Sequence, residues 1–385
     1  MRFPEFSGEW NKYTINDLAT VVGGGTPDTT VKSYWGGDIQ WFTPSEIGKN
    51  KYVDFSKRTI TRDGLDNSSA KLLPLHTILL SSRATVGECS IASNECTTNQ
   101  GFQSLIAKQC NIDFLYYLIQ TKKKDLIRNA CGSTFLEISA NEIRKIKVAV
   151  PVQNEQEQIA KLLSLIDERI ATQNKIIEKL QSLIKGLVDE LMTVLLKGKL
   201  YPFSSFYIKA GEGGTPTTSV VEYYTEGTIP FIKIEDLSCK YLTNNKDFIT
   251  ELGMQKSSAW LIPSKSVIYS NGATIGAISI NEYPVCTKQG ILGIVPNTNI
   301  NVEYLYLLMS SSYFSKEISR IITEGTMKTA YLKDINHIKC PLPSMAQQKN
   351  ITNLTSSIEE KLSIEQELLR CLNLQKQYLL RMMFI

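Results

Sequence analysis

The chain has few side chains suited to hold zinc or to act in nucleophilic catalysis. Its 385 residues include two histidines, His76 and His337, and none of its eight cysteines forms a Cys-x-x-Cys pair. Structural zinc sites draw on such pairs and on histidine, so we expect no metal site. A Ser-His-Asp or Cys-His site is equally disfavoured. Cysteines without paired spacing indicate reduced, mostly buried thiols in a cytoplasmic protein.

The sequence also lacks the loops that hold nucleotides and cofactors. Residues 23–27 (Gly-Gly-Gly-Thr-Pro) do not have the G-x-G-x-x-G spacing, and neither Gly-Lys pair, at 48–49 or at 198–199, is followed by Ser or Thr. The Asn-Pro-Pro-Tyr tetrad of amino-methyltransferases is missing. The acidic-x-Lys triplet at 359–361 has no Pro-Asp before it and falls in a predicted helix. We therefore predict no catalytic residue and no bound cofactor in this chain.

No apolar run of about 18 residues occurs, so we expect no membrane span. Residues 1–6 contain no apolar segment of a secretion signal. Hydrophobic residues make up 42% of the chain and charged residues 21%, as in folded globular proteins, and the length favours two or three folded units. The net charge of +4 is too small to identify a partner.

One sequence pattern occurs twice along the chain. Residues 24–27 (Gly-Gly-Thr-Pro) recur 189 residues later at 213–216, and residues 84–87 (Ala-Thr-Val-Gly) recur at the same displacement as Ala-Thr-Ile-Gly. Further matches follow in the same order, which chance does not explain. A period this long exceeds that of solenoid repeats, so each copy should be a domain with an appendage.

Each copy begins with short β-rich runs, such as residues 77–81 and 266–270, separated by Gly, Pro, Asn and Ser. Helical spacing of apolar residues recurs at 113–127 and 302–318. We predict the α+β class, with two mixed, mainly β globular domains related by an internal pseudo-twofold duplication. The predicted division of the chain places the globular domains at 1–150 and 198–342, and long helices at 151–197 and 343–385.

The two helices are predicted from a heptad seam, in which apolar residues step by alternating threes and fours. Residues 152–197 contain no proline, so one helix of roughly 70 Å is expected at about 1.5 Å per residue. The helices are each other's natural antiparallel coiled-coil partner, although each could instead pack only on its own globular domain. The expected residues for the seam and for subunit docking are Ile159, Leu163, Ile166, Ile170, Gln173, Ile177, Leu180, Ile351, Ile358, Leu362, Glu365, Leu369, Leu372 and Leu379.

Polar loops occupy matching positions in the two copies, but their side chains differ. Arg and Lys suit guanine, Asn and Gln suit adenine, and Ser and Thr suit phosphates or either base. Loops at matching positions that carry different polar side chains fit two domains that recognise different DNA sequences. For any single loop, the simpler interpretation is an ordinary solvated loop. The candidate DNA contacts are Thr43, Ser45, Ser81, Ser82, Arg83, Thr98, Asn99, Gln100, Lys233, Glu235, Ser270, Asn271, Lys288 and Gln289.

With these features the chain resembles the specificity subunit of type I restriction-modification systems over almost its whole length. The similarity is carried by residues 3–6 (Phe-Pro-Glu-Phe), 23–27, 34–39 (Tyr-Trp-Gly-Gly-Asp-Ile), 79–83 (Leu-Leu-Ser-Ser-Arg), 98–102 (Thr-Asn-Gln-Gly-Phe), 132–135 (Gly-Ser-Thr-Phe), and the helix starts at 150–159 and 341–348.

The resemblance implies that each globular part is a target recognition domain for one half of a split, asymmetric site in double-stranded DNA. It also implies that the helices set the spacing and dock two methyltransferase (modification) subunits, which the motor-nuclease (restriction) subunits join. S-adenosylmethionine, ATP and magnesium would then be used by those partners. In the second copy, Gly272 replaces the Arg of the Ser-Ser-Arg loop, Lys288 replaces Asn99, and residues 345–348 carry a weaker form of the helix start.

Two other functions remain open from the sequence. An autonomous nuclease or methyltransferase would need a motif that the chain does not show. A coiled-coil scaffold that does not bind DNA would fit the helices alone, and it predicts no salt-dependent affinity for DNA.

Overall fold

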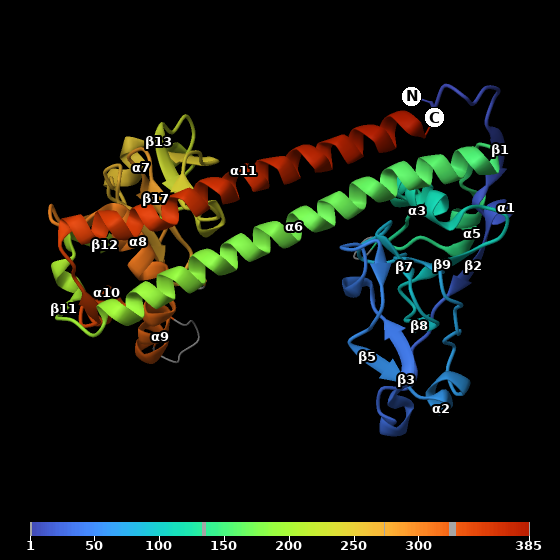
Figure 1. Ribbon diagram of the computed structural model, residues 1–385, viewed down its shortest axis with the longest axis horizontal. Helices are drawn as coiled ribbons and strands as arrows, with labels where there is room; N and C mark the ends of the chain where they lie inside the picture. The colour runs from blue at the N-terminus through green and yellow to red at the C-terminus, as the bar shows by residue number, and fades with distance from the viewer. Residues whose placement is uncertain (1, 133–135, 273, 323–328, 385) are drawn as a thin grey trace. The chain divides into compact units, whose positions relative to one another are not determined.

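The computed structural model describes residues 2–132, 136–272, 274–322 and 329–384 (Figure 1). The chain divides into two compact units, Met1–Lys175 with Glu367–Ile385 (unit 1) and Ile176–Gln366 (unit 2). Residues 133–135 of the predicted Gly-Ser-Thr-Phe motif, and Ala273 of the second Ala-Thr-Ile-Gly repeat, lie outside the described residues. The four-part division into 1–150, 151–197, 198–342 and 343–385 stays a prediction.

Unit 1 is built on three small sheets. The largest has the strand order β2-β9-β6-β7-β4, in which β4 is parallel to β7 and the other pairs are antiparallel. A three-stranded sheet has the order β5-β3-β8, and β1 pairs with β10. The strands are β1 Asn11–Thr14, β2 Ala19–Gly23, β3 Trp35–Phe42, β4 Tyr52–Val53, β5 Arg58–Ile60, β6 Ile78–Leu80, β7 Cys89–Ala92, β8 Cys96–Thr98, β9 Gln103–Ala107 and β10 Lys147–Val150.

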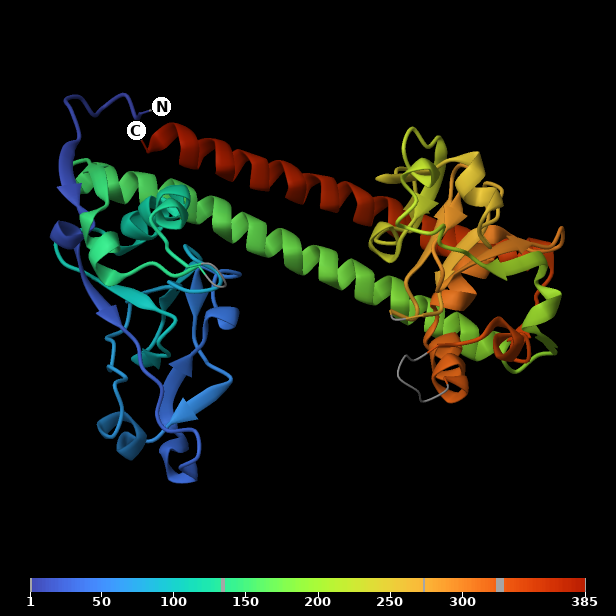
Figure 2. The same ribbon diagram turned by 180° about the vertical axis from the view of Figure 1, so that it is seen from behind.

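The helices of unit 1 form around a core that joins the large sheet to α6. Helix α3 begins where the Asn111 side chain accepts a hydrogen bond from the backbone nitrogen of Phe114, and residues 114–119 are all buried. Helix α3 lies between the sheet and α6 (Figures 1 and 2). The helices are α1 Ile15–Leu18, α2 Arg62–Asp66, α3 Ile112–Thr121, α4 Lys123–Arg128 and α5 Ala140–Lys145, with 3-10 turns at Lys32–Tyr34 and Pro44–Glu46.

Unit 2 repeats this topology strand for strand, with the orders β12-β19-β16-β17-β14, β15-β13-β18 and β11-β20. The predicted duplication and the α+β class are therefore confirmed. The strands are β11 Leu200–Pro202, β12 Tyr207–Glu212, β13 Ile229–Ile232, β14 Tyr241–Leu242, β15 Asp247–Ile249, β16 Val267–Ser270, β17 Ile278–Asn281, β18 Cys286–Thr287, β19 Ile291–Pro296 and β20 Lys339–Pro341. The helices are α7 Glu251–Gln255, α8 Val302–Ser310, α9 Ser312–Ile321 and α10 Leu332–Ile335, with 3-10 turns at Phe203–Ser205, Val221–Tyr223 and Ile234–Asp236.

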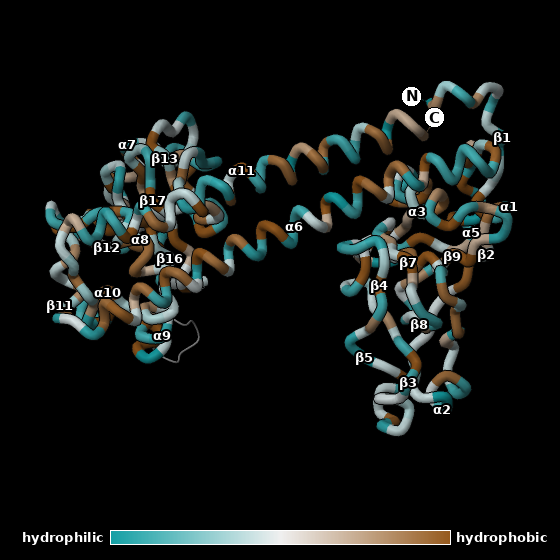
Figure 3. The backbone as a smooth tube through the Cα atoms, in the orientation of Figure 1, coloured by the Kyte–Doolittle hydropathy of each residue, from teal (hydrophilic) through white to brown (hydrophobic). Residues whose placement is uncertain are grey.

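The two long helices are α6, Gln153–Leu195, and α11, Met345–Met383. Apolar residues recur along both (Figure 3). In unit 1 the first turns of α6 pack with the end of α11 around Leu163 and Leu379, and in unit 2 the end of α6 packs with the start of α11 around Val188 and Ile351. Within each unit the two segments are therefore antiparallel. Every residue of the predicted seam is buried or half-buried.

Candidate nucleic-acid interface

Four loops meet at one end of the small sheets in unit 1. The backbone nitrogen of Gly25 donates to Thr98 O at 2.8 Å, and that of Asn99 donates to Phe42 O at 3.1 Å. The backbone nitrogen of Ser82 donates to Gly101 O at 2.8 Å. These bonds join the loops that contain residues 24–27, 43–46, 82–83 and 98–101. Loops that are far apart in the sequence thus form one surface.

The same four loops meet in unit 2 through the equivalent bonds. Gly214 donates to Thr287 O at 3.0 Å, Lys288 donates to Ile232 O at 2.9 Å, and Asn271 donates to Gly290 O at 3.0 Å, all from backbone nitrogens. The structure therefore brings together the predicted residues of each copy at one place.

The glycine turns at this surface are structural. A Cβ atom on Gly24 would lie 2.0 Å from Asn99 O, and one on Gly213 would lie 2.1 Å from Thr287 O. Neither distance is compatible with a side chain, because the neighbouring atom is backbone. The turns hold the loops in close contact, and Thr26 donates a further hydrogen bond from its hydroxyl to Gln100 Oε1.

The turn after β3 is held by a carboxylate. Thr43 donates to Glu46 Oε2 from its backbone nitrogen at 2.8 Å and from its hydroxyl at 2.6 Å. In unit 2 the backbone nitrogen of Lys233 donates to Asp236 Oδ2 at 2.9 Å. The frame is the same, while the exposed residue of the turn changes from Ser45 to Glu235.

Lys233 also has a charged partner, since its Nζ lies 2.9 Å from Asp247 Oδ2. The hydrogen bond to Asp247 raises the pKa of Lys233 above its ordinary value, although burial opposes the shift. The ammonium group stays charged at neutral pH, and the residue is half-buried.

Five of the predicted DNA contacts have buried side chains: Ser81, Ser82, Thr98, Ser270 and Asn271. Ser81 and Asn271 have partners within their units, whereas the buried hydroxyls of Ser82, Thr98 and Ser270 have no hydrogen-bond partner among the described residues. The Ser81 hydroxyl lies 3.0 Å from Thr85 Oγ1, and Asn271 Nδ2 donates to Ala330 O at 3.1 Å. A side chain without exposed surface cannot contact a ligand on the outside of the unit, so we remove these five from the expected contacts.

The other nine predicted residues are accessible. Thr43, Asn99 and Lys233 are half-buried. The Arg83 guanidinium lies 3.4 Å from Glu137, and Asn99 Oδ1 accepts a hydrogen bond from the backbone nitrogen of Gly101 at 2.9 Å. The exposed members are Ser45, Arg83, Gln100, Glu235, Lys288 and Gln289.

The sequence reasoning missed one group at this surface. The guanidinium carbon of the exposed Arg58 lies 3.6 Å from the ring centre of Trp35 and 5.4 Å from that of Trp41. Trp41 in turn donates from Nε1 to Gly25 O at 2.9 Å, which places the stack beside the glycine turn. A planar cation held on an aromatic ring suits phosphate or guanine. No sequence motif marks this stack, because β3 and β5 bring it together.

Within the described ranges, no group of three or more His, Cys, Asp or Glu side chains is placed to hold a metal ion. No helix in the same part of the chain combines the length and apolar character that membrane crossing requires.

Comparison with known proteins identifies the family to which both repeats are similar. The family model "Type I restriction modification DNA specificity domain" matches residues 7–182 and again residues 206–374. The type I restriction enzyme MjaIX specificity subunit of Methanocaldococcus jannaschii is 29% identical over 382 residues, covering 92% of this chain and 88% of that protein. The EcoR124I/EcoR124II specificity subunit of Escherichia coli is 28% identical over 43% of each chain.

Solved structures share the fold. The S subunit of a type I restriction-modification system from M. genitalium aligns over 100% of this chain and 99% of its own, with a TM-score of 0.56 and 19% identity. A chain from work on complex assembly and conformational transition of the type I R-M system aligns over 98% of both chains, with a TM-score of 0.59 and 14% identity.

Proposed function

The chain belongs to the type I restriction-modification DNA specificity family, and we propose that each of its units reads one half of a split DNA site. The family's members are specificity subunits without catalytic activity of their own, and this chain is one of them. In the proposal, double-stranded DNA is the ligand of both loop surfaces. A pair of similar but not identical readers suits a bipartite, asymmetric sequence.

The observation that carries the proposal is that the two units repeat the same loop backbone but place different polar side chains on it. The loops are joined by equivalent backbone bonds in both units, yet Ser45 is matched by Glu235, and Arg83 is matched by Gly272. Direct readout depends on the donors and acceptors of such side chains. Two frames with different polar groups should therefore prefer different base sequences.

We further propose that the long helices hold the partner subunits. Both helices carry large apolar side chains on the surface of their units, with Leu165, Leu183 and Val194 on α6 and Leu354 and Ile364 on α11 each more than half exposed. A contiguous patch of exposed apolar side chains marks a protein interface, and in the proposal these side chains contribute to one. The proposed occupants are two methyltransferase subunits, which the restriction subunits join. Those partner subunits would use S-adenosylmethionine, ATP and magnesium, and the complex would work in the cytoplasm.

The test is to purify the chain with its methyltransferase subunit and to map adenine methylation on a plasmid with and without the chain. We expect methylation at one split motif, only when the chain is present. We also expect DNA affinity that falls steeply with salt, because phosphate contacts release counterions. If the methylation pattern were the same with and without the chain, or if the complex showed no salt-dependent affinity for DNA, the DNA-free scaffold would be favoured instead.

A matched pair of variants tests the docking surface. Leu354→Lys should reduce co-purification of the methyltransferase subunit, because it puts a charge on the proposed apolar interface. Lys265→Met, far along the sequence from the helices and 60% exposed, should leave co-purification unchanged. Equal recovery of the subunit with both variants would contradict docking at this face.

A further inference from the structure

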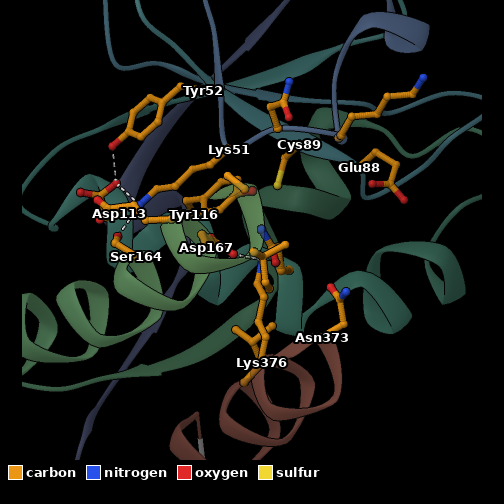
Figure 4. Close-up of a pocket in the computed structure, with 18 of the residues that line it drawn as sticks. Lys51, Tyr52, Glu88, Cys89, Asp113, Tyr116, Ser164, Asp167, Asn373 and Lys376 are labelled. Carbon is orange, nitrogen blue, oxygen red and sulfur yellow. Dashed lines mark hydrogen bonds and ion pairs between the residues drawn. The ribbon is translucent and has the colours of Figure 1, made fainter. Parts of the chain in front are cut away.

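One lysine in unit 1 joins the globular part of the unit to α6. Lys51 stands directly before β4, and its Nζ lies 2.7 Å from Asp113 Oδ1 at the start of α3 and 2.6 Å from Ser164 Oγ on α6. Its side chain is only 9% exposed. Figure 4 shows the Lys51 side chain extending toward Asp113 and Ser164, with the Tyr52 hydroxyl also directed at Asp113. The Tyr52 hydroxyl donates to Asp113 Oδ1 at 2.8 Å.

Unit 2 contains the same arrangement. Lys240 stands directly before β14, 189 residues after Lys51, and its Nζ lies 2.5 Å from Glu303 Oε2 on α8 and 2.5 Å from Glu359 Oε2 on α11. The Tyr241 hydroxyl donates to Glu303 Oε1 at 2.8 Å. Each unit thus ties a strand, a short helix and one long helix through a single ammonium group.

The charge of Lys240 is secured by its two partners. Burial alone would lower the pKa of Lys240, but the hydrogen bonds to Glu303 and Glu359 outweigh it and raise the pKa above its ordinary value. The group is therefore an ammonium ion at any physiological pH. Two directional contacts to one cation, from two different helices, restrict the angle at which the elements can meet, which an apolar contact does not.

Energetics argue that these lysines do more than add stability. Removing two partly buried charges from water costs free energy that their attraction only partly returns, so apolar packing of the same volume would stabilise equally well. Each unit already has an apolar core that includes its segment of α6. An ion pair present in both copies, while the loop residues differ, fits a role in orientation.

We call the contacts of Lys51 in unit 1 and of Lys240 in unit 2 the two clamps, and they differ in one respect. In unit 1 the carboxylate at the position of Glu359 is Asp167, which pairs with Lys376 of α11 at 2.6 Å and accepts the Tyr117 hydroxyl at 2.7 Å. Lys51 bonds Ser164 on the same turn of α6 instead. Different side chains thus reach the same connection between the strand, the short helix and the long helix.

We propose that Lys51 and Lys240 are positioning residues, which fix each globular part at one angle on its long helix and so determine how strictly the spacing between half-sites is read. The inference rests on the proposed function. The partners of the two ammonium groups lie on α3, α6, α8 and α11 and not in the loops that form the proposed DNA surfaces. Each would act on recognition through the orientation of the unit that carries it.

The test uses the full chain in complex with its methyltransferase subunits. Initial methylation rates are measured on DNA that carries both half-sites at the natural spacing, and on DNA with the spacing one base pair shorter or longer. The variants are Lys51→Met and Lys240→Met. The matched controls are Lys145→Met in unit 1 and Lys265→Met in unit 2, whose ion pairs with Glu142 and Glu282 are exposed.

We expect both clamp variants to recognise the same half-site sequences. The ratio of the methylation rate at the natural spacing to that at the altered spacing should fall roughly tenfold, as would follow from one lost charged contact. The controls should keep the preference. Should Lys240→Met fail to fold, Lys240→Arg keeps the charge, changes the geometry and should still relax the spacing.

Three results would decide against the inference. One is an unchanged spacing preference in folded clamp variants whose melting temperature alone has fallen, which would mean that the lysines only stabilise. Another is a change in the half-site sequences. The third is the absence of any split methylation site with the unmodified chain, which would overturn the proposed function and the inference with it.

Discussion

Gln348 Oε1 lies 2.8 Å from the backbone nitrogen of Asn301 and accepts its hydrogen bond, which joins the first turn of α11 to the N-cap of α8. Gln156 makes the same bond to Asn111 at 3.0 Å at the start of α6. Each glutamine amide also donates to the carbonyl of the proline five residues before it. Both side chains are buried. These bonds fix where each long helix starts relative to the globular part of its unit.

We expect Gln348→Ala to lower the free energy of unfolding by about 1–3 kcal/mol, because the Asn301 donor loses its acceptor in a partly buried place. Urea denaturation of the full chain, followed by far-UV circular dichroism, measures the change. Gln366→Ala is the control, since Gln366 is exposed on the same helix and should change stability by about 0.5 kcal/mol at most. Equal losses in the two variants would contradict the role of this bond.

The glycine turns give a second stability prediction. Gly213→Ala should destabilise unit 2 by about 1–3 kcal/mol or more, because its Cβ would lie 2.1 Å from Thr287 O and the backbone must shift. Gly24→Ala should do the same in unit 1. Gly186→Ala is the opposite case: nothing lies within 4 Å of its Cβ in α6, so the variant should gain about 0.5–1 kcal/mol. Thermal unfolding that ranks the variants otherwise would refute this account.

The sequence predicted the features that repeat within it. The duplication, the mixed sheets and the long helices follow from matched motifs and from the heptad steps between residues such as Ile159 and Leu163, which are local signals. It could not predict which loop residues are buried. Ser82 follows β6 and its backbone bonds to Gly101, so its exposure depends on strand pairing between distant segments. Contacts such as Arg2 with Glu155 at 2.6 Å, or Arg58 with Trp35, are equally nonlocal.

Two cations at the loop surfaces should act on different half-sites. Lys288→Ala should weaken binding to DNA that carries only the second unit's half-site, and Arg58→Ala should do so for the first, each by about tenfold. Competition binding of the full complex at two salt concentrations measures both affinity and its salt dependence. A lysine that contacts only phosphate would lower the salt slope by about one and weaken all sequences alike.

The control for both variants is Lys265→Met, which removes an exposed cation of unit 2 that pairs with Glu282. Its DNA affinity should match that of the unmodified chain. If Lys288→Ala and Arg58→Ala weakened both half-sites equally and without any change in salt slope, the assignment of each loop surface to one half-site would be wrong.

Thiol reactivity should separate the cysteines by burial. Cys131, Cys239 and Cys371 are exposed. Burial raises the pKa of Cys96 to about 12 and that of Cys286 to about 11. A thiolate is the reactive form, and a raised pKa moves its appearance to higher pH, so at pH 8 these two thiols should be protonated as well as shielded.

At pH 8 we therefore expect an Ellman reagent to modify three thiols promptly and all eight cysteines only after unfolding in guanidinium. The half-buried Cys110, whose pKa burial raises to about 12, should react slowly between these limits. Replacing the three exposed cysteines by Ser should remove the prompt phase and leave the slow one. Prompt reaction of more than three thiols in the folded chain would show that a core strand such as β8 or β18 opens readily, which the packing of both units argues against.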